Sequence, residues 1–148
     1  IEEYNGLNPI AEPNGNCLDQ QQVTIEAYQP DADLLSANSD HIVTETLYSH
    51  LLKTNCPVTD QPDWASIYIS YTGPQIDRVG LLQYIVSFRQ HQDFHEQCVE
   101  KVFTDILLHC HCTELSVYAR YMRRGGLDIN PFRSTSQTVP PRYRQVRQ

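Results

Sequence analysis

The chain has 148 residues, of which 40% are hydrophobic, and it is long enough to bury the core of one ordinary domain. It contains no run of about 18 apolar residues, and its N-terminal stretch is polar and acidic, so we expect neither a membrane span nor a signal peptide. The net charge of −7 argues against direct binding to nucleic acid.

The cysteines and the charge distribution indicate a compartment and a kind of ligand. The five cysteines form an odd set without regular spacing, which predicts reduced thiols in the cytoplasm rather than a disulfide framework. Residues 1–119 hold 17 acidic and 4 basic side chains, whereas residues 120–148 hold seven arginines and one aspartate. This arginine-rich end is suited to a small anion.

The first half of the chain contains patterns typical of strands. Residues 23–28 are expected to form a short strand, and residues 30–40, rich in Asp, Ser and Asn, a loop. A second strand is expected over residues 44–52. Residues 64–72 alternate between two sets of side chains, as a half-buried strand does, and the Gly-Pro pair that follows should end it.

Two helices and a final pair of extended segments follow. Residues 77–89 repeat apolar side chains at helical spacing after Asp77, a suitable N-cap, and residues 93–109 carry a second apolar stripe. Residues 115–122 alternate again, and two glycines turn the chain into a last extended piece that reaches residue 129.

The order of elements predicts an α+β fold. Strands joined by short connections pair in antiparallel fashion, so the two helices should lie on one face of the sheet. The Ser-, Thr- and Pro-rich tail after residue 133 is expected to be irregular. Met122 is the only methionine, so we expect residues 1–22 to be a segment left from a longer chain, and residues 23–148 to form the folded module.

Cys56 is the first candidate for chemistry. It precedes a proline, which disfavours helical backbone and places the thiol in a loop or turn. Lys53 is close in sequence, and its positive charge would lower the pKa of the thiol and favour the nucleophilic thiolate. The alternative is a small buried cysteine with no chemical role.

Asp63 lies seven residues later, directly before Trp64. A carboxyl group pressed against an apolar ring loses hydration, so it could keep a proton and act as a general acid. An exposed loop aspartate at the start of a strand is the alternative.

His95 and Glu96 stand at the start of the second expected helix. A carboxylate is favoured in a first helical turn for electrostatic reasons alone. Its functional use would be recognition, because a carboxylate accepts two parallel hydrogen bonds and so matches the edge of a guanine-like base.

Metal binding is a further alternative. His91, His95 and Cys98 fall at helical spacing, and Cys110 and Cys112 flank another histidine, so zinc ligands of the right type are present. Paired Cys-x-x-Cys spacing is absent, however, and we expect no metal site. The sequence also has no glycine-rich phosphate loop of the common dinucleotide-binding types.

The segment from residue 118 to residue 126 is the densest cationic stretch, and it ends at Arg124 and Gly125 followed by a second glycine. Arginines beside glycines can bind phosphate through side chain and exposed backbone together. A sheet edge protected by charge is the alternative explanation.

Three motifs together resemble a known family: residues 52–56 with residues 61–64, residues 94–98, and residues 118–131 with Arg133. They are similar to the bimodular preQ0 reductases, the NADPH-dependent 7-cyano-7-deazaguanine reductases of queuosine synthesis. The likeness extends over residues 23–148, and three long motifs in the same order make it specific.

The resemblance implies the tunnelling fold and a reaction. Cys56 would attack the nitrile carbon to give a covalent thioimide, and Asp63 would donate protons to the nitrile nitrogen. The resemblance further implies that His95 and Glu96 hold the deazaguanine base and that Arg124 and Gly125 contact NADPH, two molecules of which would reduce the nitrile to the aminomethyl group.

The chain departs from that family pattern in its upstream part. Bimodular members carry an upstream motif of Glu, Ser and Lys type that nothing here matches, so we expect this chain to act with a missing N-terminal half, as a homodimer. Phe132 stands where tryptophan is expected, a mild exchange. Two rival readings stay open, a zinc-dependent hydrolase related to the cyclohydrolases of the same fold and a non-catalytic module of an assembly.

Overall fold

The computed structural model describes residues 10–148 except residues 12, 141–143 and 146. Within this part, the elements in chain order are β1 (Ile10–Ala11), β2 (Asn16–Cys17), η1 (Ala32–Leu34), β3 (Ala37–Asn55), β4 (Pro62–Ile76), α1 (Arg78–Ser87), η2 (Phe88–Gln90), α2 (His95–Cys110), β5 (Glu114–Tyr121), β6 (Phe132–Ser134) and β7 (Arg144–Gln145).

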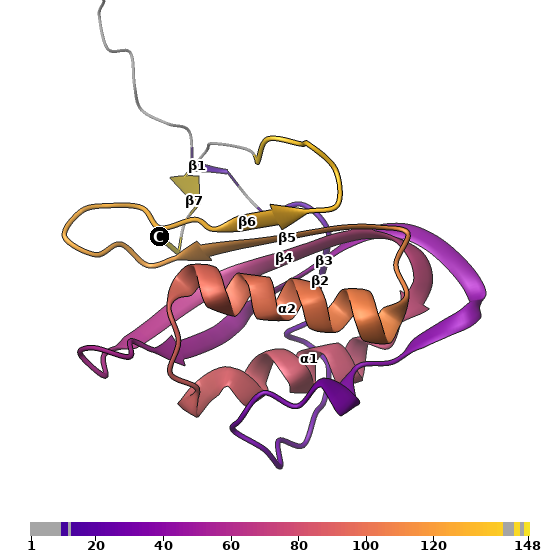
Figure 1. The fold of residues 1–148 in the computed structure, drawn as a ribbon, viewed down its shortest axis with the longest axis horizontal. Helices are drawn as coiled ribbons and strands as arrows, with labels where there is room; N and C mark the ends of the chain where they lie inside the picture. Colours follow the sequence, from indigo (N-terminus) through magenta and orange to yellow (C-terminus); the bar gives the residue numbers. More distant parts are fainter. Residues whose placement is uncertain (1–9, 12, 141–143, 146) are drawn as a thin grey trace, which may run out of the picture.

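A five-stranded sheet in the order β2-β3-β4-β5-β6 forms the centre of the fold. β3, β4, β5 and β6 pair in antiparallel fashion, whereas β2 adds two residues in parallel to β3. The helices α1 and α2 lie together on one face of this sheet, and the short pair β1-β7 lies beyond the other face (Figure 1). The predicted α+β class, with an antiparallel sheet and two helices on one face, is confirmed.

The two central strands are longer than the sequence pattern predicts. β3 begins at Ala37, inside the expected loop, and β4 continues past the Gly-Pro pair to Ile76. Gly73 has φ +154°, and an added Cβ would lie 2.8 Å from the Cα of Cys112, so glycine permits close packing here without ending the strand. Pro74 pairs with Ile42 beside a register shift in β3, a place where a missing N–H is tolerated.

The predicted strand over residues 23–28 is wrong. This segment is extended but belongs to no sheet, and it runs beside α1, where the side chain of Gln83 donates to the carbonyl of Thr24 at 3.0 Å. Val23 and Ile25 are partly buried against the core. The alternation therefore reflects packing on the helix layer rather than strand pairing.

Both predicted helices are present. Asp77 caps α1, accepting a hydrogen bond from the backbone N–H of Gly80 at 2.8 Å. α2 begins at His95 rather than residue 93, because the backbone of Phe94 is extended, with ψ 153°. The backbone N–H of Asp93 donates to the carbonyl of Asn55 at 3.2 Å. The chain before α2 is thus fixed to the end of β3.

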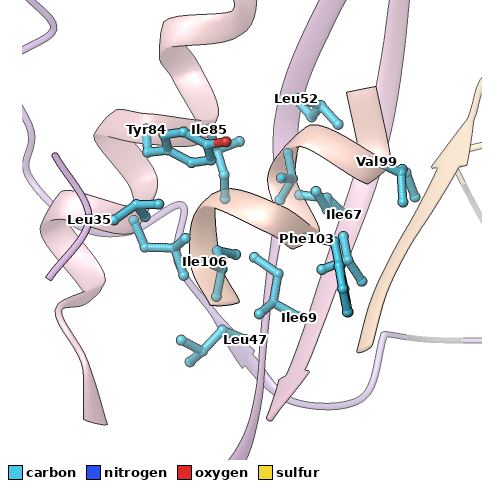
Figure 2. Close-up of a cluster of buried hydrophobic side chains, with 14 of the residues drawn as sticks. Leu35, Leu47, Leu52, Ile67, Ile69, Tyr84, Ile85, Val99, Phe103 and Ile106 are labelled. Carbon is cyan, nitrogen blue, oxygen red and sulfur yellow. The ribbon is translucent and has the colours of Figure 1, made fainter. Parts of the chain in front are cut away.

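The core fills the space between the sheet and the helices, as Figure 2 shows for its main side chains. Ile67 and Ile69 of β4 are fully buried, and Phe103 and Ile106 of α2 pack in the same cluster. None of the helices in the described part of the chain is long and apolar enough to cross a membrane.

The glycine turn after β5 is confirmed. Gly125 and Gly126 have φ +56° and +80°, and Arg124 and Leu127 exchange two backbone hydrogen bonds across them. The chain then runs back along β5 and forms β6, so the extended piece reaches beyond residue 129.

Truncation of Ile67 should reveal how much stability the sheet-helix interface supplies. Ile67→Ala removes a side chain with 0% exposure and leaves a cavity, so we expect the free energy of unfolding to fall by about 2–5 kcal/mol. Ile42→Ala on β3, where the side chain is 65% exposed, should cost less than about 1 kcal/mol. Equal losses in urea denaturation would contradict the assignment of the core.

Candidate active site

Cys56 lies in the tight loop that joins β3 to β4. The last strand pair is Asn55 with Pro62, and the loop is closed by a hydrogen bond from the backbone N–H of Cys56 to the carbonyl of Gln61 at 2.9 Å. Asp60, at φ +56°, donates its backbone N–H to the carbonyl of Cys56 at 2.9 Å. The predicted loop position is confirmed, and the loop is held in one shape by its own backbone.

The pKa of the Cys56 thiol is lowered from its ordinary value. The largest cause is a hydrogen bond from the hydroxyl of Thr59, followed by the backbone N–H groups of Thr59 and Val58, and the charge of Arg124 also contributes. The expected role of Lys53 is wrong. Its ammonium group donates instead to the side chain of Asn55 and to a backbone carbonyl, each at 2.9 Å.

The buried cysteines have raised pKa values, in contrast to Cys56. Burial raises the pKa of Cys98 and of Cys110 to about 12, and that of Cys112 to about 11. These thiols stay protonated near neutral pH. Of these four thiols, Cys56 is therefore the one best suited to act as a nucleophile.

Asp63 is the second residue of β4 and is buried, with 5% of its surface exposed, on the face that the helices cover. Arg124 donates to its Oδ1 from both Nε and Nη2, at 2.8 and 2.6 Å. The Nε2 atom of His95 lies 3.3 Å from Oδ2. The burial expected for Asp63 is confirmed, but the apolar neighbour is not Trp64.

The side chain of Trp64 points to the other face, because adjacent residues of a strand alternate. It is 36% exposed, and the guanidinium of Arg89 lies 5.8 Å from the centre of its ring. Asp63 thus has charged partners where the sequence suggested an indole.

His95 connects α2 to this cluster. Its ring packs edge-on against Tyr121 with 4.2 Å between ring centres, and its buried Nε2 atom forms no hydrogen bond of good geometry among the described residues. The pKa of Tyr121 is raised well above its ordinary value, chiefly by burial and then by Cys98, so its hydroxyl stays protonated. This nitrogen faces Asp63 and is shielded from solvent.

Two of the proposed site residues make no contact with this cluster. Glu96 follows His95 in the first turn of α2 and is exposed, without a hydrogen bond or ion pair to any residue that the structure describes. Gly125 lies on the exposed turn next to Arg124. The structure therefore joins Cys56, Asp63, His95 and Arg124 into one cluster and places Glu96 and Gly125 at its edges.

Sequence reasoning missed the residues that shape the loop. Thr59 supplies the main hydrogen bond to the thiol, and Gln92 fixes the loop by donating to Asp60 at 2.8 Å. A hydroxyl three residues beyond a loop cysteine is a usable signal. The sequence gives no such signal for Gln92, because its contact with Asp60 depends on how the segment before α2 folds back on β3.

The residues considered as alternative zinc ligands do not converge. Within the described residues, no group of three or more histidine, cysteine, aspartate or glutamate side chains is arranged to hold a metal ion. His91 lies 3.2 Å from Asp93, and Cys98 and Cys110 are in the core. The residues present do not give a zinc-dependent hydrolase its ligand set.

Comparisons with known proteins give a family match, curated relatives and a solved structure of similar fold. Residues 62–140 match the family model described as QueF-like protein. The NADPH-dependent 7-cyano-7-deazaguanine reductase of Azoarcus sp. (strain BH72) is 63% identical over 128 residues, covering 86% of this chain and 45% of that protein. The protein of the same name from Saccharophagus degradans is 54% identical over 148 residues, covering 100% of this chain and 55% of that protein.

The chain therefore spans about half the length of the curated relatives that it matches. Among solved structures, the apo form of the archaeosine synthase QueF-Like superposes with a TM-score of 0.56 at 15% identity, covering 67% of this chain and 96% of that one. This likeness is one of fold, and it confirms the expected tunnelling-fold class.

Replacement of Thr59 should slow the reaction of Cys56 with alkylating agents. Thr59→Val removes the largest cause of the lowered pKa, so less thiolate forms and we expect alkylation by iodoacetamide at pH 7 to slow several-fold, with the pH profile moved upward. Thr104→Val on the exposed side of α2 is the matched control. Peptide mapping gives the rate at each cysteine; an unchanged profile at Cys56 would contradict the role of Thr59.

Proposed function

The chain belongs to the QueF-like protein family, and from this premise we propose that it carries the catalytic cysteine of an NADPH-dependent reductase. This enzyme converts the nitrile of 7-cyano-7-deazaguanine (preQ0) to the primary amine of 7-aminomethyl-7-deazaguanine (preQ1), in queuosine biosynthesis in the cytoplasm. The observation that carries the proposal is the partly exposed loop thiol of Cys56, whose pKa is lowered, close to Arg124, which also binds the buried Asp63.

Cys56 acts as the nucleophile. Its thiolate attacks the electrophilic nitrile carbon, a C–S bond forms, and the product is a thioimide. A cysteine suits this step because its thiolate is strongly nucleophilic at neutral pH and can leave again after the carbon has been reduced. The hydrogen bonds from Thr59 and Val58 stabilise the anion before the attack.

Asp63 supplies protons to the nitrogen. The nitrile nitrogen gains negative charge as the C–S bond forms, so a carboxyl group beside it lowers the barrier by proton transfer. Asp63 lies on the helix-covered side of β4, with His95 against its second oxygen. This arrangement keeps bulk water away from the carboxyl group.

His95 and Glu96 bind the deazaguanine base. Glu96 presents a carboxylate that is exposed and has no partner in the described part of the chain, so both of its oxygens are available to a ring N–H and an amino group. His95 lies beside Glu96, with its buried Nε2 atom against Asp63. The two residues are consecutive on the first turn of α2, which fixes their spacing.

The turn at Arg124 and Gly125 is suited to NADPH. Arg124 is 32% exposed in its side chain, and a Cβ on Gly125 would meet no atom within 4 Å, so a phosphate can approach both the guanidinium and the backbone. NADPH, when bound, supplies a hydride; two are needed to bring a nitrile to an amine. Arg124 and Gly125 hold the cosubstrate, and Asp63 is the proton donor.

The chain works together with a further N-terminal half and as a homodimer. The relatives are about twice as long as this chain. Large apolar side chains are exposed on the three loops around the site: Val58, Phe94, Met122 and Leu127 are 78%, 49%, 52% and 71% exposed. Such a rim is typical of a surface that another part of the protein covers. We also divide the chain into residues 1–22, a segment of the longer protein, and a catalytic module of residues 23–148.

Cysteine variants of the full-length protein test the nucleophile. With 7-cyano-7-deazaguanine and no NADPH, we expect intact-mass spectrometry to show one adduct of substrate mass, mapped to Cys56. Cys56→Ala should abolish it, whereas Cys98→Ala, which changes a fully buried thiol, should keep it. Equal adduct in both variants, or none in the wild-type protein, would overturn the proposed function.

A further inference from the structure

The ion pair between Arg124 and Asp63 conflicts with a simple proton-donor role for Asp63. Two guanidinium N–H groups converge on Oδ1 at 2.8 and 2.6 Å, and Nε2 of His95 lies 3.3 Å from Oδ2. The side chain of Asp63 is only 6% exposed. With cationic donors on Oδ1 and an imidazole against Oδ2, neither oxygen is placed to pass a proton to a substrate.

The groups facing Asp63 come from three other segments of the fold. Gln61, from the loop after β3, accepts a third contact from Arg124 at 3.4 Å; His95 comes from α2; and the uncharged Tyr121 comes from β5. Among the described residues that face Asp63, Arg124 carries the permanent positive charge. The same charge acts on Cys56.

Arg124 is attached to a part of the chain that can move without disturbing the core. It opens the two-glycine turn, whose backbone is exposed and which has space on its outer side. Asp63, in contrast, is fixed in β4 by pairing between Thr54 and Asp63. If the ion pair opens, the guanidinium is therefore the partner that leaves.

We propose that Arg124 controls proton supply at this site: its guanidinium occupies Oδ1 of Asp63 in the unliganded protein and withdraws before Asp63 passes a proton to the substrate. This inference rests on the proposed nitrile reduction. It makes Arg124 a positioning residue for the covalent step, in addition to any contact with phosphate.

The covalent step then balances in atoms and charge. With the guanidinium withdrawn, solvent reaches Asp63, which takes a proton from a hydronium ion and leaves a water molecule. The Cys56 thiolate forms a bond to the nitrile carbon, one π electron pair of the nitrile moves to nitrogen, and nitrogen takes the proton from Asp63. The product is a neutral thioimide and a carboxylate, to which Arg124 returns. The return of the guanidinium favours the transfer because it stabilises the carboxylate that the transfer creates.

The pH profile of thioimide formation in the full-length protein tests this inference. Arg124→Gln frees Oδ1 of Asp63 and removes one of the charges that lower the pKa of Cys56, so we expect the optimum of adduct formation without NADPH to move to higher pH. Arg124→Lys, which keeps the charge, should restore most of the wild-type profile. Arg123→Gln is the matched control, because Arg123 is exposed and pairs with Asp128 instead.

The outcomes separate this inference from the proposed function. An Arg124→Gln profile lowered equally at every pH, with the optimum unmoved, would overturn the role of Arg124 in proton supply while leaving Cys56 as the nucleophile. A shift of the same size in Arg123→Gln would also overturn it. No adduct on Cys56 in the wild-type protein at any pH would instead overturn the nitrile reduction itself.

Discussion

The antiparallel pairing of β3 with β4 is the constraint on which the site depends. Its last rungs join Thr54 to Asp63 and Asn55 to Pro62, so the loop with Cys56 can only lie beyond them. Strand alternation puts Asp63 on the same face as Ile67, under the helices. A shift of one residue would move the carboxyl group to the opposite face and separate it from α2 and from Arg124.

A second layer of contacts brings distant segments to that end of the sheet. The backbone N–H of Asn55 donates to the carbonyl of His91 at 2.9 Å, and its carbonyl accepts from the N–H of Asp93 at 3.2 Å. These bonds place the start of α2, and with it His95, next to Asp63. β5 pairs with β4 and ends next to Trp64, so the following turn delivers Arg124. The apolar core fixes the strands and α2, and the site is assembled from the ends of these elements.

The sequence predicted the elements that have a regular period and a cap. α1, α2 and the centre of β4 follow from apolar spacing and, for α1, from Asp77, because burial on one face imposes that spacing. It failed where tertiary packing sets the outcome. Residues 23–28 alternate but lie against α1 without pairing, and Gly73 serves close packing inside a strand rather than a turn.

Cys56 and Asp63 were predictable as candidates, but the electrostatics around them were not. Lys53 is near in sequence yet binds elsewhere, whereas Arg124 is distant in sequence and lies beside both groups. The local sequence does not show which cationic side chain the fold places next to a thiol. Extending the alternation of β4 back to Asp63 would have placed it on the buried face, but would not have named its partner.

The most direct test of the account is a crystal structure of the full-length protein with 7-cyano-7-deazaguanine and without NADPH. The account predicts continuous electron density from Sγ of Cys56 to the former nitrile carbon, with the base against Glu96. Substrate bound elsewhere beside an unmodified Cys56 would contradict it.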